Sequence, residues 1–138
     1  MHASRTFDSV TVGDELQPIA IPITLQRLVM EAGANRDFSL IHHDRDVAKA
    51  TGAPDAYMNT FFIAGMFERL LREWMGQDGR LNKITGLRMN VFNAIGDTVT
   101  FCGKVARAEN ESRQVEVELW SESEKGKTVT ATATVTLP

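Results

Sequence analysis

The sequence has 138 residues, of which 43% are hydrophobic and 24% charged, with a net charge of −3, as is typical of a globular domain. This length predicts one domain, residues 1–138, and the acidic balance without a basic stripe argues against a nucleic-acid partner. The single cysteine, Cys102, excludes an internal disulfide and fits a reducing cytoplasm. The first ten residues lack the basic start and apolar core of a signal peptide, so we expect a cytoplasmic protein.

The start of the chain predicts a strand followed by a helix. Residues Leu16–Pro22 read as a strand, but their two prolines indicate either an edge strand or a bent strand. Thr24 is a suitable N-cap for a helix over Leu25–Ala32, and Gly33 is the expected end of that helix.

A carboxylate and an imidazole follow this helix, as Asp37 and His42. Five residues along a helix turn roughly 500°, which would leave the two side chains about 140° apart, and a strand would put them on opposite faces. If the two act together, the chain between them is an irregular turn, which Phe38, Leu40 and Ile41 are expected to anchor against a core. Such a loop suits acid–base chemistry; the alternative is a surface turn with an ordinary half-buried histidine.

Two helices are expected next. A short one covers Arg45–Thr51, and a long apolar one covers Asn59–Met75, with Asn59 or Thr60 as its N-cap. Residues Phe61–Phe67 contain no polar side chain, which predicts a helix wrapped by other structure. The segment is too short, and too charged at its end, to span a membrane.

The second half of the chain alternates between apolar and polar residues, as half-buried antiparallel strands do. Short polar connections between the later segments predict hairpins. Helices that precede a meander indicate an α+β fold. The expected strands are Leu87–Phe92, Val99–Val105, Val115–Trp120 and Val129–Leu137.

The run Arg36-Asp37-Phe38-x-x-Ile41-His42-His43-Asp44, followed by a small helix, Gly52-x-Pro54 and a long apolar helix, resembles the MaoC-like (R)-specific enoyl-CoA hydratases. The resemblance implies a hotdog fold, in which a curved antiparallel sheet wraps a long central helix. It also implies that Asp37 and His42 are the catalytic pair. Within the family, the pattern is most similar to the small catalytic subunit of heteromeric hydratases that act on steroid side-chain CoA esters.

The chain departs from the usual family pattern at several positions. Arg36, Ser39 and Leu40 stand where the family usually has glycine, asparagine and proline. A His-Gly pair that often opens the central helix is replaced by Asn59-Thr60.

The resemblance implies hydration of a 2-enoyl-CoA thioester. An Asp/His pair that meets around one water could move both protons, and which group moves which proton stays open. The backbone N–H groups of Asn59 and Thr60, at the start of the apolar helix, are candidates for binding the thioester oxygen, because they lack partners within the helix. Phe61 and Phe62 are candidates for lining the acyl pocket.

No cofactor is expected beyond the CoA of the substrate, and no metal, because His42 and His43 point in alternate directions without further ligands to complete a site. An unpaired sheet edge and an open acyl tunnel predict a homodimer, or a heterodimer with a second hotdog chain. One rival reading is a hotdog acyl-CoA thioesterase that uses Asp55 or Glu68. The other is a non-catalytic hotdog subunit, against which the presence of both Asp37 and His42 counts.

Overall fold

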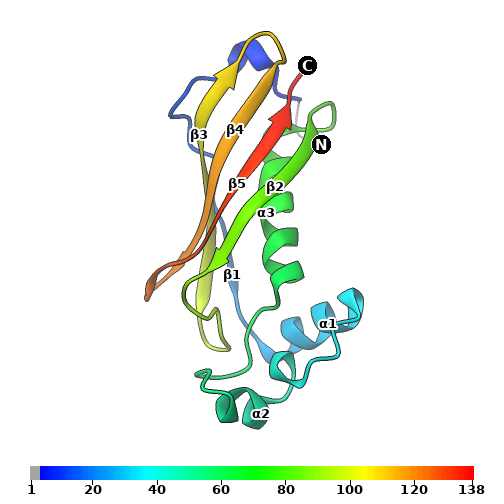
Figure 1. Cartoon of the computed structure of the whole chain (residues 1–138), viewed down its shortest axis with the longest axis vertical. Coiled ribbons are helices and arrows are strands. Elements are labelled where there is room, and N and C mark those ends of the chain that lie inside the picture. The colour runs from blue at the N-terminus through cyan, green and yellow to red at the C-terminus, as the bar shows by residue number, and fades with distance from the viewer. Residues whose placement is uncertain (1–3) are drawn as a thin grey trace.

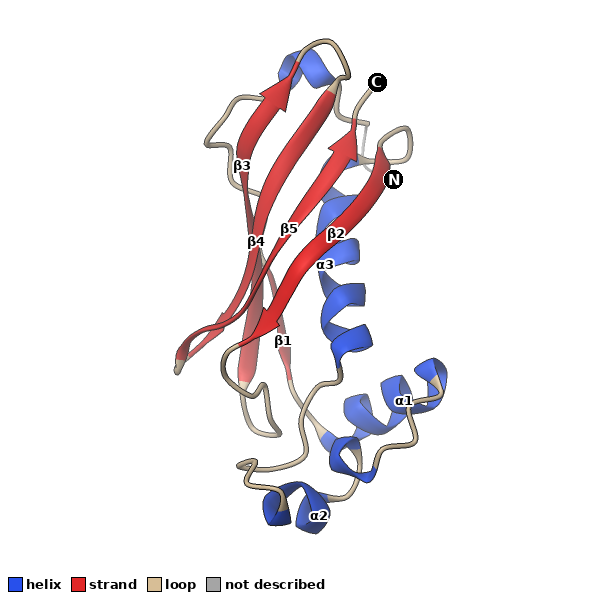
Figure 2. Ribbon diagram, in the orientation of Figure 1, coloured by secondary structure: helices blue, strands red, loops and turns tan. Residues whose placement is uncertain are grey.

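A twisted antiparallel sheet of five strands lies along one long helix in the computed structural model, which describes residues 4–138 (Figure 1). The helices between residues 25 and 50 form a separate group beyond one end of the sheet, and the short helix of residues 7–9 lies at the other end (Figure 2). In chain order the elements are η1 (Phe7–Ser9), β1 (Ile19–Pro22), α1 (Leu25–Asn35), η2 (Leu40–His42), α2 (Arg45–Ala50), α3 (Thr60–Met75), β2 (Arg80–Met89), β3 (Thr98–Glu109), β4 (Gln114–Ser123) and β5 (Gly126–Thr136). This arrangement confirms the predicted α+β class.

The sheet has the strand order β1-β3-β4-β5-β2, so β1 and β2 are its edges. The hairpins from β3 to β5 confirm three predicted strands, and β1 confirms the predicted edge strand in shortened form. Gly103 in β3 is needed for close packing, because a Cβ atom there would lie 3.0 Å from a side-chain carbon of Leu16.

The prediction for β2 was wrong, because the strand covers Arg80–Met89 rather than Leu87–Phe92. No residue of this strand is fully buried, since its outer edge is open in the described chain. Its register against β5 also shifts twice, after Leu81 and after Thr85. An exposed edge with two irregularities shows little of the alternation by which the sequence identifies strands.

The predicted end of α1 was also wrong. The helix continues through Gly33 to Asn35, and Arg36 terminates it in the left-handed conformation with φ 55°. The N–H of Arg36 donates to the carbonyl oxygens of Ala32 and Gly33, as in a normal helix C-terminus. Arg36 stands at the position where related sequences usually have glycine, which adopts this conformation without strain.

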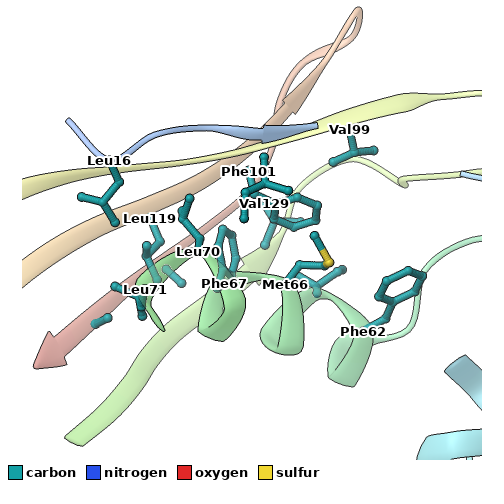
Figure 3. Close-up of a cluster of buried hydrophobic side chains, with 14 of the residues drawn as sticks. Leu16, Phe62, Met66, Phe67, Leu70, Leu71, Val99, Phe101, Leu119 and Val129 are labelled. Atoms are coloured by element: carbon teal, nitrogen blue, oxygen red, sulfur yellow. The ribbon is translucent and has the colours of Figure 1, made fainter. Parts of the chain in front are cut away.

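The α3 helix covers Thr60–Met75, as the sequence predicted, with Asn59 as N-cap and Gly76 after its last residue. Figure 3 shows its buried side chains packed against the sheet. The ring of Phe67 meets that of Phe101 edge to face, with the centroids 5.4 Å apart. The remaining labelled side chains of this cluster are Leu16, Phe62, Met66, Leu70, Leu71, Val99, Leu119 and Val129.

The expectation that α3 is wrapped on all sides was wrong for the described chain. Phe61 is 65% exposed, and Gly65, one turn later, is also exposed. The sheet covers only one face of the helix (Figure 1). Within residues 4–138, no helix is long and apolar enough to cross a membrane.

Candidate active site

The turn between α1 and α2 brings Asp37 and His42 together. The N–H of Asp37 donates to the carbonyl oxygen of Ala32 in the last turns of α1 over 2.9 Å. The chain then forms the single turn η2, which ends at His42. The carboxylate oxygen Oδ2 of Asp37 lies 3.4 Å from Nε2 of His42. The irregular turn required for these residues to meet is therefore present.

The predicted apolar anchors of this turn were mostly wrong. Phe38 is 77% exposed and Leu40 is 51% exposed, and only Ile41 packs in part against the core. The turn is held instead by its main-chain hydrogen bonds and by the ring of His42, which is buried. Alternation of polar and apolar residues could not distinguish these roles in a segment without regular structure.

His42 is oriented by the segment before α3. Its Nδ1 lies 2.8 Å from the carbonyl oxygen of Tyr57, and its ring meets the Tyr57 ring edge to face at 5.1 Å. A carbonyl oxygen can only accept, so Nδ1 carries the proton of this hydrogen bond. In the neutral ring, Nε2 then presents its lone pair toward Asp37.

The Asp37 carboxylate accepts two further hydrogen bonds. The backbone N–H of Ser39 donates to Oδ1 over 3.2 Å, and the side-chain amide of Asn59 donates to Oδ2 over 3.2 Å. An ionised carboxylate only accepts, so both contacts suit that form. Asp37 keeps 27% of its side chain accessible while His42 keeps 9%, which leaves the carboxylate as the more open group of the pair.

The start of α3 adjoins this pair through Asn59. Its Oδ1 accepts the N–H of Phe62 over 2.7 Å, and its carbonyl accepts the N–H of Ile63. Within residues 4–138, the backbone N–H groups of Thr60 and Phe61 have no acceptor. Of the two candidates for the acyl pocket, Phe61 is exposed, whereas Phe62 is buried between α3 and the sheet.

An ion pair fixes the chain just before Tyr57. Nη2 of Arg45 lies 2.6 Å from Oδ2 of Asp55, Nε donates to Oδ1 over 2.9 Å, and Nζ of Lys49 is 3.9 Å away. The Arg45 hydrogen bonds lower the pKa of Asp55 to about 2, against the opposing effect of burial. Sequence patterns do not indicate this pair, because ten residues and a turn separate its members.

The loop between β2 and β3 supports the same segment from the sheet side. The N–H of Met58 donates to the carbonyl oxygen of Asn93 over 2.9 Å, and Tyr57 forms an isolated bridge with Ala94. The side chain of Asn93 is fully buried and has no hydrogen-bond partner within the described residues. Nothing in the sequence indicated this buried amide.

The remaining candidate chemistry is limited. Cys102 is buried, and burial raises the pKa of its thiol to about 11, which disfavours the thiolate. Over residues 4–138, the His, Cys, Asp and Glu side chains form no group of three that could hold a metal ion.

Comparison with known proteins gives the following matches. No family model matches the chain. The chain is 41% identical over 78 residues to the 3-oxo-4,17-pregnadiene-20-carboxyl-CoA hydratase beta subunit of Mycobacterium tuberculosis. That match covers 56% of this chain and 60% of the subunit, which is less than two thirds of the relative's length.

Solved structures match over a longer range. A chain in the crystal structure of the ChsH1-ChsH2 complex from Mycobacterium tuberculosis has 32% identity and a TM-score of 0.87, over 93% of this chain and 98% of that one. A MaoC-like dehydratase has 26% identity and a TM-score of 0.89, over 98% of this chain and 43% of that one.

The sheet along a central helix and these structural matches define a hotdog-fold protein. The chain belongs to the MaoC-like family of hydratases and dehydratases.

Proposed function

We propose that the chain is an enoyl-CoA hydratase, which adds water across the double bond of a 2-enoyl-CoA thioester and catalyses the reverse dehydration. The observation that carries this proposal is the approach of Asp37 Oδ2 to His42 Nε2 at 3.4 Å, with Nδ1 of His42 already committed to Tyr57. Two acceptors that face each other at this distance suit one water molecule that donates a hydrogen to each.

Hydration needs two proton transfers. One member of the pair takes a proton from the water as its oxygen bonds to Cβ, and the electron pair of the double bond moves toward the thioester carbonyl. A proton then reaches Cα, which restores the carbonyl and leaves a 3-hydroxyacyl-CoA. Asp37 and His42 are the groups that take the proton from the water and deliver a proton to Cα. Because one proton is taken and one is delivered, the protonation state of the pair is the same before and after a turnover.

The thioester oxygen gains negative charge between these steps. The unpaired N–H groups of Thr60 and Phe61 at the start of α3 are donors for that charge, with the helix dipole adding to their effect. The N–H of Phe62 is excluded from this role, because it already donates to Asn59. The N–H of Asn59, which the sequence also suggested, likewise has no acceptor within residues 4–138, so the candidate donors are the N–H groups of residues 59–61.

The acyl group of the substrate is proposed to be bulky and apolar. Phe38 directly follows Asp37 in the chain, Phe61 directly follows Thr60, and both side chains are exposed. The matching hydratase subunit is named for a pregnadiene-carboxyl-CoA, which is a steroid side-chain thioester. A steroid acyl group therefore fits this proposal.

The natural assembly is proposed to include a second hotdog chain. The outer edge of β2 is unpaired within residues 4–138, and α3 has an exposed face at Phe61 and Gly65. A partner along this edge would extend the sheet and cover the helix. The structural match to a chain of the ChsH1-ChsH2 complex supports a partner that differs in sequence.

The two carboxylates that a thioesterase could use, those of Asp55 and Glu68, are both in ion pairs. Asp55 is held by Arg45 and Lys49, and Glu68 forms an exposed pair with Arg72 over 2.7 Å. Neither carboxylate is free to activate a water at the start of α3.

The test is to assay the purified chain with crotonyl-, octenoyl- and steroid-enoyl-CoA, alone and with candidate partner chains. We expect loss of the enoyl thioester and formation of 3-hydroxyacyl-CoA, without release of free CoA thiol. Thiol release in place of hydration would establish the thioesterase instead. A lack of turnover with every substrate and partner would overturn the proposal.

A further inference from the structure

The side chain of Asn59 connects the two polar parts of the site. Its Oδ1 accepts the N–H of Phe62 over 2.7 Å, which caps α3. Its Nδ2 donates to Oδ2 of Asp37 over 3.2 Å, the same oxygen that faces His42. Asn59 is only 4% exposed, so water does not compete strongly for either contact.

The helix fixes which way this amide points. The N–H of Phe62 is a donor and requires an oxygen, so Oδ1 must face the helix. The amide nitrogen is then directed at Asp37. A flipped amide would set two donors against each other at the helix and two oxygens against each other at Asp37, so both hydrogen bonds would be lost.

We propose that the Asn59 side chain is a positioning residue that holds the Asp37 carboxylate in the orientation needed for proton transfer, with α3 as its rigid support. The inference rests on the proposed hydratase function, and it gives Asn59 a side-chain role separate from any role of its backbone. The contact from Ser39 cannot replace it, because that N–H donates to the other oxygen, Oδ1, from an exposed turn.

The decisive variant is Asn59→Asp. An aspartate keeps the cap, because its oxygen accepts the Phe62 N–H and a negative charge suits a helix N-terminus. It replaces the donor that faces Asp37 with a second carboxylate. We expect a folded variant with a lower melting temperature at neutral pH, because the two carboxylates repel each other, and a fall in kcat of about 10–100-fold with KM changed by less than about threefold.

This variant has a pH signature that a purely structural role would not produce. Two carboxylates in contact hold one proton between them as the pH falls, and a protonated Asp at position 59 donates as the amide does. The ratio of variant to wild-type kcat should therefore rise toward low pH. Two outcomes would overturn the inference. One is a ratio of variant to wild-type kcat that is below one and does not change with pH, and the other is a variant kcat equal to that of the wild type at all pH values.

Two further variants complete the experiment. Asn59→Ser keeps a capping oxygen, but its hydroxyl ends one atom short of the amide nitrogen that donates to Asp37, so it should lower kcat as well. Thr24→Ser exchanges the cap of α1, which accepts the N–H of Arg27, and should leave kcat unchanged.

One measurement does not depend on activity. NMR scalar couplings should show one side-chain rotamer for Asp37 in the wild type and several in Asn59→Ser. A single unchanged rotamer in that variant would contradict the inference even if the chain proved not to be a hydratase. If the wild-type chain hydrated none of the substrates, that result would overturn the proposed function and not the positioning role of Asn59.

Discussion

Nδ1 of His42 donates to the main-chain oxygen of Tyr57 over 2.8 Å, and this contact leaves Nε2 as the ring nitrogen that faces Asp37. The partner is a carbonyl that every residue type carries, so it has no signature in the sequence. In the neutral ring, the lone pair of Nε2 then faces Asp37, which suits the proposed role of the two groups in binding one water.

The first prediction concerns this pair. Asp37→Asn and His42→Ala should each lower kcat by roughly 10²–10⁴-fold, because each removes one partner in proton transfer. The double variant should be little worse than the poorer single variant, because the two groups act as a unit. His43→Ala is the control, since within residues 4–138 the side chain of His43 forms no hydrogen bond or ion pair with either residue. The test is steady-state kinetics on variants whose circular dichroism spectra match the wild type. Near wild-type turnover in either single variant would contradict the role of that residue in proton transfer.

The second prediction concerns the start of α3. Thr60→Pro removes a backbone N–H, while Asn59 already has the extended conformation, ψ 166°, that a following proline requires. If this N–H binds the thioester oxygen, kcat should fall by about 10²–10³-fold with a modest loss of stability.

Leu25→Pro is the matched control, because it makes the same change at the first position of α1. It should leave hydration near wild type. Full activity in Thr60→Pro would show that the N–H of Thr60 does not bind the thioester oxygen.

The third prediction concerns Arg36, whose left-handed conformation costs about 1–2 kcal/mol for a residue with a Cβ atom. Arg36→Gly relieves that strain but gains freedom in the unfolded chain, so the free energy of unfolding should rise by about 0.5–1 kcal/mol. Arg27→Gly, the same exchange inside α1, should lower it by about 1 kcal/mol. Denaturant melts measure both, and a destabilised Arg36→Gly would show that the arginine side chain contributes more than its backbone costs.

The fourth prediction concerns the ion pair of Asp55 with Arg45. Asp55→Asn should lower the free energy of unfolding at neutral pH by about 2 kcal/mol, the usual worth of hydrogen bonds to a charged group. The hydrogen bonds from Arg45 lower the pKa of Asp55 from the ordinary 3.8 to about 2, so this contribution is complete above about pH 5.

The contribution should decline as the pH falls from about 5 toward about 2, and the two proteins should converge in stability. Asp78→Asn, at an exposed aspartate, should show no such difference. Denaturant melts from neutral pH into this range provide the test. A stability gap that persists at the lowest pH would refute the assignment to the Asp55 carboxylate.

The fifth prediction concerns assembly. The open edge of β2 and the exposed Phe61 predict a dimer in solution, with the two sheets joined edge to edge. Light scattering gives the mass, and active-site titration gives the number of sites per particle. A monodisperse and fully active monomer would rule out any dimer. A homodimer active on short enoyl-CoA esters without a partner would rule out the heteromeric form.

Regular apolar patterns made much of the fold predictable. The bounds of α3 and the presence of three strands between Val99 and Leu137 follow from strong periodicity with clear caps and turns, although β3 and β4 extend further, to Glu109 and Ser123. The edge strand β2 and the end of α1 did not follow, because an exposed edge lacks alternation and Arg36 occupies a conformation typical of glycine. Sequence patterns describe burial well and exposed or strained backbone poorly.

Of the candidate site, only the two titratable residues could be predicted from the sequence. Asp37 and His42 were identified from their spacing and family resemblance, and the structure places them in contact. The Tyr57 carbonyl, the Asn59 amide bridge and the Arg45–Asp55 pair were not, because contacts of main-chain or amide groups depend on three-dimensional placement. The predicted apolar anchors failed for the same reason.

The hydrogen-bond partners described for the side chains of Asp37 and His42 all come from one short part of the chain, and its most distant members, Asp37 and Asn59, are 22 positions apart. The strands contribute none of these partners. After gene duplication, a few substitutions in this segment could therefore silence one copy while its sheet kept the ability to associate. An ancestor with two equivalent catalytic centres could diverge into a working chain and a dedicated companion in this way. The space of the lost centre would then become available to larger substrates.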